Sequence, residues 1–172
     1  MKKQLQNITV LGSALLISAC VNAQTPSNDT IILSDCAIQE SIPGAKATGA
    51  FLTVKKADDA PLSIVAAKAP DVTDHVEIHE MLMQDNKMVM SQIEAYPLQK
   101  GDNIFKKGGY HIMLMDMQKK LTAGEHYDIT LVFSDGSEKS CNAVVKTVKA
   151  LTPKHMKKNT MKPMQEMQKA SH

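Results

Sequence analysis

Residues 127–137 read YDITLVFSDGS, a run rich in β-branched, aromatic and aliphatic residues that ends in an Asp-Gly pair. Such residues favour β-strands, and Asp-Gly at the centre of a two-residue loop is typical of a β-hairpin. We therefore expect a strand over 127–133 and a two-residue hairpin loop centred on Asp135 and Gly136. A further run of this kind, AVVKTV, follows at 143–148.

More short runs of the same composition precede this hairpin. They cover residues 50–54, 62–65, 76–79 and 110–117, with turns expected at Pro43-Gly44, Asp58-Asp59, 100–103 and Gly108-Gly109. Outside the C-terminal tail, no stretch of twelve residues has the 3.6-residue apolar period of a helix. Many short strands at this spacing predict an all-β domain, either an antiparallel sandwich or a barrel.

The composition argues against two broad classes of function. All 20 cationic side chains are Lys, 18 residues are acidic, the net charge is +2 and only 3% of residues are aromatic. A chain without Arg, a basic excess or stacking side chains is poorly suited to bind nucleic acid. The sequence also lacks a nucleophile elbow, a Ser/His/Asp arrangement and a carboxylate pair near a histidine, so we expect no enzyme activity.

The N-terminus has the features of an export signal. Lys2 and Lys3 precede a mainly apolar run over 8–17, which is too short for a membrane span of about 20 residues. The sequence ISAC at 17–20 resembles a bacterial lipobox, which would make Cys20 a lipidated N-terminus, whereas VNA allows cleavage after Ala23. We favour the lipobox, and in both cases we expect a signal peptide over 1–23 and a periplasmic protein, soluble or lipid-anchored.

A polar linker over 24–30 leads to the domain expected at 31–148, which is long enough for one core. Residues 149–172 differ, because they hold six Lys, one Glu, two Pro and no β-branched apolar residue. We expect this segment to be a flexible tail. The segment 24–148 holds 12 Lys and 17 acidic residues, a net charge of −5, whereas the tail carries +5.

Two cysteines remain once Cys20 is lipidated or removed. In an oxidising compartment two such thiols usually pair. Cys36 and Cys141 lie on the first and last expected strands, which sandwiches often bring together. We expect a disulfide between them, the alternative being two separate buried thiols.

Three neighbouring segments each combine an apolar face with a face of His and Met, because side chains i and i+2 of a strand share a face. The second face carries His75, Glu77, His79, Met81 and Met83, then Met88 and Met90, and finally His111, Met113, Met115 and Met117. Neutral imidazole nitrogens beside soft, uncharged thioethers suit Cu(I). Thioethers have no proton to lose, so only the His ligands make such a site pH-dependent. The alternative is a Met-rich groove that binds peptides.

The pattern His79-x10-Met90-x20-His111-x-Met113 resembles the His/Met signature of the periplasmic copper chaperones called PCu(A)C. The segments PGAKATGAFLTV (43–54), VEIHEMLM (76–83) and GGYHIMLM (108–115) match as well, and the resemblance covers about residues 31–148. Two departures are visible. The family usually has 21 residues where this chain has 20, which a shorter loop around 95–103 would absorb, and it often has an aromatic residue near Cys36.

The resemblance implies a cupredoxin-like, Greek-key antiparallel β-sandwich that binds Cu(I) through His79, Met90, His111 and Met113. It also implies delivery of copper to the copper centre of a respiratory oxidase or to another copper chaperone. A periplasmic copper-buffering or resistance protein is the alternative function. The membrane would be contacted only through an N-terminal lipid anchor.

The tail repeats the ligand chemistry without strands to support it. Its candidate ligands are His155, Met156, Met161, Met164, Met167 and His172. We expect a second copper site here, of Cu(I) on the thioethers or of Cu(II) on the imidazoles, since some members of the family carry similar extensions. The alternative is an amphipathic helix that docks on a partner.

Overall fold

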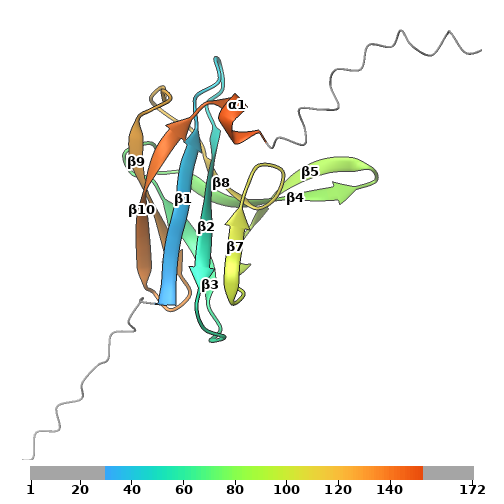
Figure 1. Ribbon diagram of the computed structural model, residues 1–172. Helices are drawn as coiled ribbons and strands as arrows, with labels where there is room; N and C mark the ends of the chain where they lie inside the picture. Colours follow the sequence, from blue (N-terminus) through green and yellow to red (C-terminus); the bar gives the residue numbers. More distant parts are fainter. Residues whose placement is uncertain (1–29, 153–172) are drawn as a thin grey trace, which may run out of the picture.

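The computed structural model describes residues 30–152, which form a β-sandwich with one short helix (Figure 1). The strands are β1 (Ile31–Gln39), β2 (Thr48–Lys56), β3 (Ser63–Lys68), β4 (Val76–Gln84), β5 (Lys87–Ile93), β6 (Tyr96–Pro97), β7 (Gly101–Phe105), β8 (His111–Leu114), β9 (His126–Phe133) and β10 (Glu138–Lys146), and the helix is α1 (Val148–Leu151). The signal peptide, Cys20 and the tail ligands expected from the sequence lie outside the described residues. Within 30–152, no helix is long and apolar enough to cross a membrane.

The strands pair in the order β5-β4-β8-β2-β1-β10-β9-β3-β6, and β7 adds to β2 beside β8. The sheet does not close on itself, so the fold is a sandwich rather than a barrel, and the prediction of an all-β sandwich is confirmed. The prediction of a wholly antiparallel arrangement needs one correction. Ala37–Gln39 of β1 pair in parallel with Val144–Lys146 of β10. A parallel pair needs a long crossover connection, and here the rest of the domain provides it.

The hairpin that opens β10 differs from the prediction. The N–H of Phe133 donates to the carbonyl of Ser137 at 2.9 Å, and the N–H of Gly136 donates to the carbonyl of Phe133 at 2.9 Å. The loop therefore has three residues, Ser134 to Gly136, and Gly136 takes the positive φ of 81° that such loops place at their last position. A two-residue loop occurs instead between β4 and β5, where both Asp85 and Asn86 have positive φ.

Two other segments also depart from the predicted elements. The turn expected at 100–103 lies largely within β7, since only its first residue, Lys100, precedes the strand. The strand expected over 110–117 ends at Leu114, because Asp116 adopts a φ of 48° that an extended strand does not allow. Met117 therefore does not continue the His/Met face of β8 and packs against the core instead.

The core consists mainly of aliphatic side chains, including Ile38, Leu52, Ile64, Ile112 and Leu131, together with the rings of Phe105 and Phe133. Cys36 of β1 and Cys141 of β10 form a disulfide at its edge, joining residues 105 apart in the sequence. This bond links the first and last of the long strands, and so closes the chain around the core.

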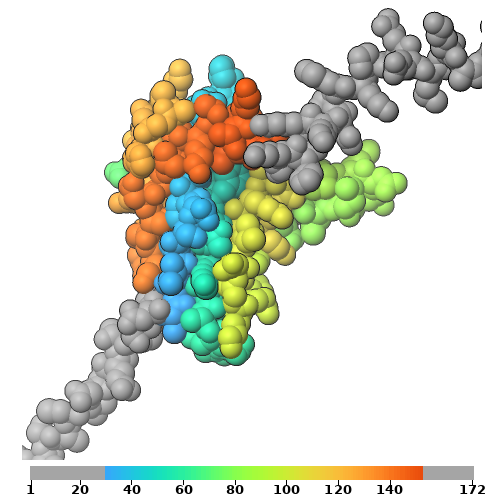
Figure 2. All heavy atoms as spheres, viewed as in Figure 1, coloured from blue at the N-terminus to red at the C-terminus, as the bar shows by residue number. Residues whose placement is uncertain are grey.

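The β4–β5 hairpin projects from the sandwich as a two-stranded arm (Figures 1 and 2). From Leu82 to Met90 every residue of the arm is exposed, on both faces. The apolar face expected for these strands is thus only partly covered. Ile78 is buried in the core, whereas Leu82 is 48% exposed.

Candidate metal centre

One face of the sheet carries the predicted His and Met residues across three adjacent strands. His79 of β4 lies directly opposite His111 of β8, and Glu77 lies opposite Met113. On the other side of β4, Met81 lies opposite Met90 of β5. Residues directly opposite one another in antiparallel strands project from the same face.

The two histidines form the centre of this face. Their ring centroids are 5.8 Å apart, with the rings at 61°. The Nδ1–H of His111 donates to the carbonyl of Gly109 at 2.9 Å, which leaves Nε2 with a lone pair for a ligand. His111 is only 7% exposed, and this burial lowers the pKa of its imidazole below the ordinary value. The ring is therefore held neutral, which is the form that binds a metal.

The ring of His79 is held through its other nitrogen, Nε2. Its Nε2 lies 2.7 Å from Oε2 of Glu77, so that the N–H donates to the carboxylate. Its Nδ1 is buried and has no hydrogen-bond partner among the described residues. A buried nitrogen without a partner is costly, and a metal ion on this face would satisfy it.

Glu77 belongs to a longer chain of hydrogen bonds. Its Oε1 accepts from Nε2 of His75 at 3.0 Å, and Nδ1 of His75 lies 2.8 Å from Oδ2 of Asp116. The hydrogen bond to Asp116, followed in size by the one to Glu77, raises the pKa of His75. The hydrogen bond to His79, followed in size by the one to His75, lowers the pKa of Glu77. These supporting residues were not predicted as part of the site. The i, i+2 spacing placed two of them, His75 and Glu77, on the same face as His79, but nothing in the sequence pointed to Asp116.

The two methionines flank the histidines from opposite directions. Met113 is two residues beyond His111 and is partly buried, whereas Met90 lies diagonally across from His79 and is 48% exposed. Residues in a diagonal relation are about 7–8 Å apart, within reach of long side chains. Gly49 of β2 faces Met113, and a Cβ there would lie 2.9 Å from Cζ of Phe51. The ring of Phe51 thus covers Gly49 and forms an apolar wall, 6.4 Å from the ring of His111.

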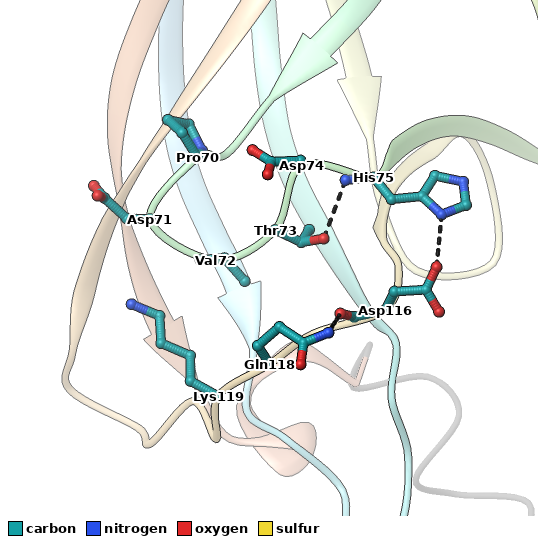
Figure 3. Close-up of a pocket in the computed structure, with 9 residues that line it drawn as sticks. All are labelled: Pro70, Asp71, Val72, Thr73, Asp74, His75, Asp116, Gln118 and Lys119. Carbon is teal, nitrogen blue, oxygen red and sulfur yellow. Dashed lines mark hydrogen bonds and ion pairs between the residues drawn. The ribbon is translucent and has the colours of Figure 1, made fainter.

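A shallow pocket of about 420 Å³ lies beside this face (Figure 3). In its wall, the carboxylate of Asp116 points at the ring of His75, and the side chain of Thr73 accepts from the backbone N–H of His75 at 3.1 Å. None of the four predicted copper ligands lines the pocket. The pocket therefore adjoins the His/Met face at His75, and the four predicted copper ligands lie outside it.

Comparison with known proteins places this chain in a family. Residues 31–145 match the family described as "Putative lipoprotein LpqE-like". The chain belongs to the LpqE-like family. A relative from Leifsonia xyli subsp. xyli, named "Putative lipoprotein Lxx21020", is 28% identical over 77% of this chain and 84% of its own length. "Uncharacterized protein RP573" of Rickettsia prowazekii is 36% identical over 41% of this chain and 40% of its own length.

Solved structures establish the fold of this LpqE-like protein. The copper-bound PCuAC domain from PmoF2 superposes with a TM-score of 0.57 at 21% identity, covering 69% of this chain and 93% of that domain. The Cu(I) form of DR1885 from Deinococcus radiodurans gives a TM-score of 0.55 at 24% identity, covering 74% and 85%. The fold is thus that of the PCuAC domains, as the sequence resemblance predicted.

Proposed function

We propose that this LpqE-like protein is an exported copper chaperone that carries Cu(I) on His79, Met90, His111 and Met113. One observation carries the proposal: His79 and His111 oppose each other, and each has one nitrogen held by a protein acceptor. The other nitrogen of each ring is left for a ligand, on a face that also carries thioethers. Two imidazoles and two thioethers are a soft, uncharged donor set that favours Cu(I) over harder divalent ions.

Copper is the cargo in this proposal, and the site is suited to releasing the ion to a partner protein. Nδ1 of His79 and Nε2 of His111 stay in fixed positions, because Glu77 and the Gly109 carbonyl hold the rings from the other side. Met90 is exposed and flexible, so a partner's ligand can replace its thioether first. Stepwise ligand exchange of this kind transfers the ion without oxidising it.

The names of the relatives support copper as the cargo and a lipid anchor. Two of the solved structures with this fold contain copper, and the Leifsonia relative is named a lipoprotein. We infer that the protein acts in the periplasm, soluble or anchored through lipidated Cys20, and delivers copper to a respiratory oxidase or to another chaperone. The tail, with His155, Met156 and Met161 among its ligands, would hold a further copper ion.

A copper-buffering or resistance protein is the second candidate, because the tail adds binding capacity that a courier does not need. The two functions differ in what happens to the bound ion. The Cu(I)-loaded full-length chain, incubated with the apo copper domain of an oxidase, should transfer its metal to that domain. Retention of the metal under conditions where free Cu(I) loads the acceptor would support the buffering function instead.

Binding itself is tested by competition with a Cu(I) chelator. The wild-type chain should withhold Cu(I) from the chelator, and a chain with His79→Gln and His111→Gln should lose this high-affinity phase. Equal competition by the two proteins would overturn the proposed site.

A further inference from the structure

The β4–β5 arm carries more thioethers than the proposed site uses. Met81 lies opposite Met90, and one step further along the arm Met83 lies opposite Met88. All four project from the face that carries His79, because each is an even number of residues from it or directly opposite such a residue. Only Met90 belongs to the proposed four-ligand site, so Met81, Met83 and Met88 remain unused.

The spacing of these side chains allows three thioethers to meet on one ion. Directly opposed residues have Cβ atoms about 4.5–5.5 Å apart, and residues i and i+2 of a strand are about 7 Å apart. Each Met side chain has three rotatable bonds, so its sulfur can cover the remaining distance. Met83 and Met88 form one pair, and Met81 reaches them from the adjacent position on β4.

The environment of Met83 and Met88 favours a ligand role over packing, whereas Met81 at the base of the arm is partly buried. Met83 is 66% exposed and Met88 is 49% exposed, on an arm that extends from the sandwich into solvent (Figure 2). A strand position with one solvated face is usually polar, and a large apolar side chain gains little there from burial. Leu82 and Val89 point to the opposite face of the arm, so the sulfur-bearing residues are confined to the side of the histidines.

We infer that Met81, Met83 and Met88 form a second Cu(I) site on the arm, adjoining the His79–His111 site. This inference rests on the proposed copper function. Met90 lies between the two sites, opposite Met81 and diagonal to His79. An ion on the arm can therefore move towards the histidines by exchanging one thioether at a time, remaining Cu(I) throughout. The arm would act as the station where copper enters or leaves.

The test uses Ag(I), a diamagnetic probe for soft Cu(I) sites, and the full-length chain labelled with ¹³C at the Met methyl groups. The methyl signals are assigned by single Met→Leu variants, which conserve volume. We expect Ag(I) to shift the signals of Met81, Met83 and Met88 as one set, separately from those of Met90 and Met113. In the M81L/M83L/M88L variant, the amount of bound Ag(I) should fall by about one ion per chain, with Met113 still responding.

A matched variant with three tail substitutions, M161L/M164L/M167L, controls for general loss of thioethers and should leave the arm signals responsive. If the three arm signals stay unchanged while Met113 shifts, the arm site is wrong and its exposed methionines are better explained as a surface that docks a protein. If the arm signals shift while Met90 and Met113 do not, the four-ligand site fails and the arm site stands.

Discussion

Oε2 of Glu77 lies 2.7 Å from Nε2 of His79, and the opposite nitrogen of the same ring is buried without a hydrogen-bond partner among residues 30–152. The carboxylate therefore determines which nitrogen of His79 carries the proton. It leaves Nδ1 as the nitrogen that faces the proposed copper. Carboxylates in this position orient a histidine ligand and raise its basicity.

We expect Glu77→Gln to weaken Cu(I) binding by about 10- to 100-fold, the range typical of lost carboxylate support behind a histidine ligand. Competition with a Cu(I) chelator measures the change. Glu80→Gln is the matched control, because Glu80 lies on the other face of the same strand and should have little effect. Equal loss in both variants would show that the effect comes from charge on the strand rather than from orientation of His79.

A second prediction concerns the thioether of Met113. Met113→Ile keeps the size and the β-propensity of the side chain but removes the sulfur. The variant should fold normally, as measured by urea unfolding, and should bind Cu(I) more weakly than wild type. Met117→Ile serves as the control, because Met117 follows the end of β8 and packs against the core. Unchanged Cu(I) affinity in Met113→Ile would rule out this residue as a ligand.

The period-two pattern and the family resemblance predicted that His79 and His111 would share a face, and the register of β4 and β8 places them directly opposite each other. Alternation fixes the face within each strand, and the apolar face of each strand is expected to pack towards the core, so the His/Met faces of β4 and β8 lie on the same side. The contact between Asp116 and His75 could not be predicted. It depends on a positive φ at Asp116, which turns the chain back after β8.

The exposure of the arm could not be predicted for a related reason. Leu82 and Val89 alternate with methionines, as apolar residues do in a strand with one buried face. In the structure both side chains are exposed instead, and the sequence alone does not show this. The sequence predicts a turn where β7 lies, because Gly101, Asp102 and Asn103 are typical of turns. Its pairing with β2 outweighs these local preferences.

The buried His111 makes the stability of the apo protein depend on pH. Burial places its folded-state pKa below the value of about 6.5 expected for an unfolded chain. The unfolded chain then binds the proton more readily, so protonation of this histidine favours unfolding. The contribution of the neutral, buried ring to the free energy of unfolding is fully present above about pH 6.5 and is lost as the pH falls through the folded-state pKa. Urea unfolding at a series of pH values should show this decline in the wild type and a flatter profile in His111→Gln. Parallel profiles would contradict it.

His75 should respond in the opposite direction. Asp116 and Glu77 raise its pKa, so its contribution to stability is present below about pH 6.5 and is lost as the pH rises through the raised folded-state pKa. Asp116→Asn should bring the pKa of His75 back towards its ordinary value, as followed by NMR of the imidazole signals. Equal titration curves for the His75 signals in the variant and in the wild type would contradict this prediction.

The disulfide should contribute strongly to stability. Cys36 and Cys141 close a loop of about 100 residues, and the entropy that such a cross-link removes from the unfolded chain corresponds to about 4–5 kcal/mol. We expect the C36S/C141S variant to unfold at lower urea concentration than the oxidised wild type. Wild-type protein treated with a reductant should behave like the variant. A reductant that leaves the wild-type transition unchanged would show that the bond adds little.

The final prediction concerns the tail. The helix α1 ends at Leu151, and the hydroxyl of Thr152 donates to the carbonyl of Val148 at 2.7 Å, so removing residues 153–172 keeps the last described contact of the domain. We expect this truncation to change the free energy of unfolding of the apo domain by less than about 0.5 kcal/mol, as surface changes usually do. It should also lower the bound copper by about one ion per chain, because it removes a set of soft ligands.

A full-length chain in which Met156, Met161, Met164 and Met167 are replaced by Leu, and His155 and His172 by Gln, separates ligand loss from loss of the segment. It should bind as little copper as the truncated chain while keeping the lysines. If both variants bind as much copper as the wild type, the tail holds no metal, and its positive charge opposite the acidic domain makes a docking or tethering role the better explanation.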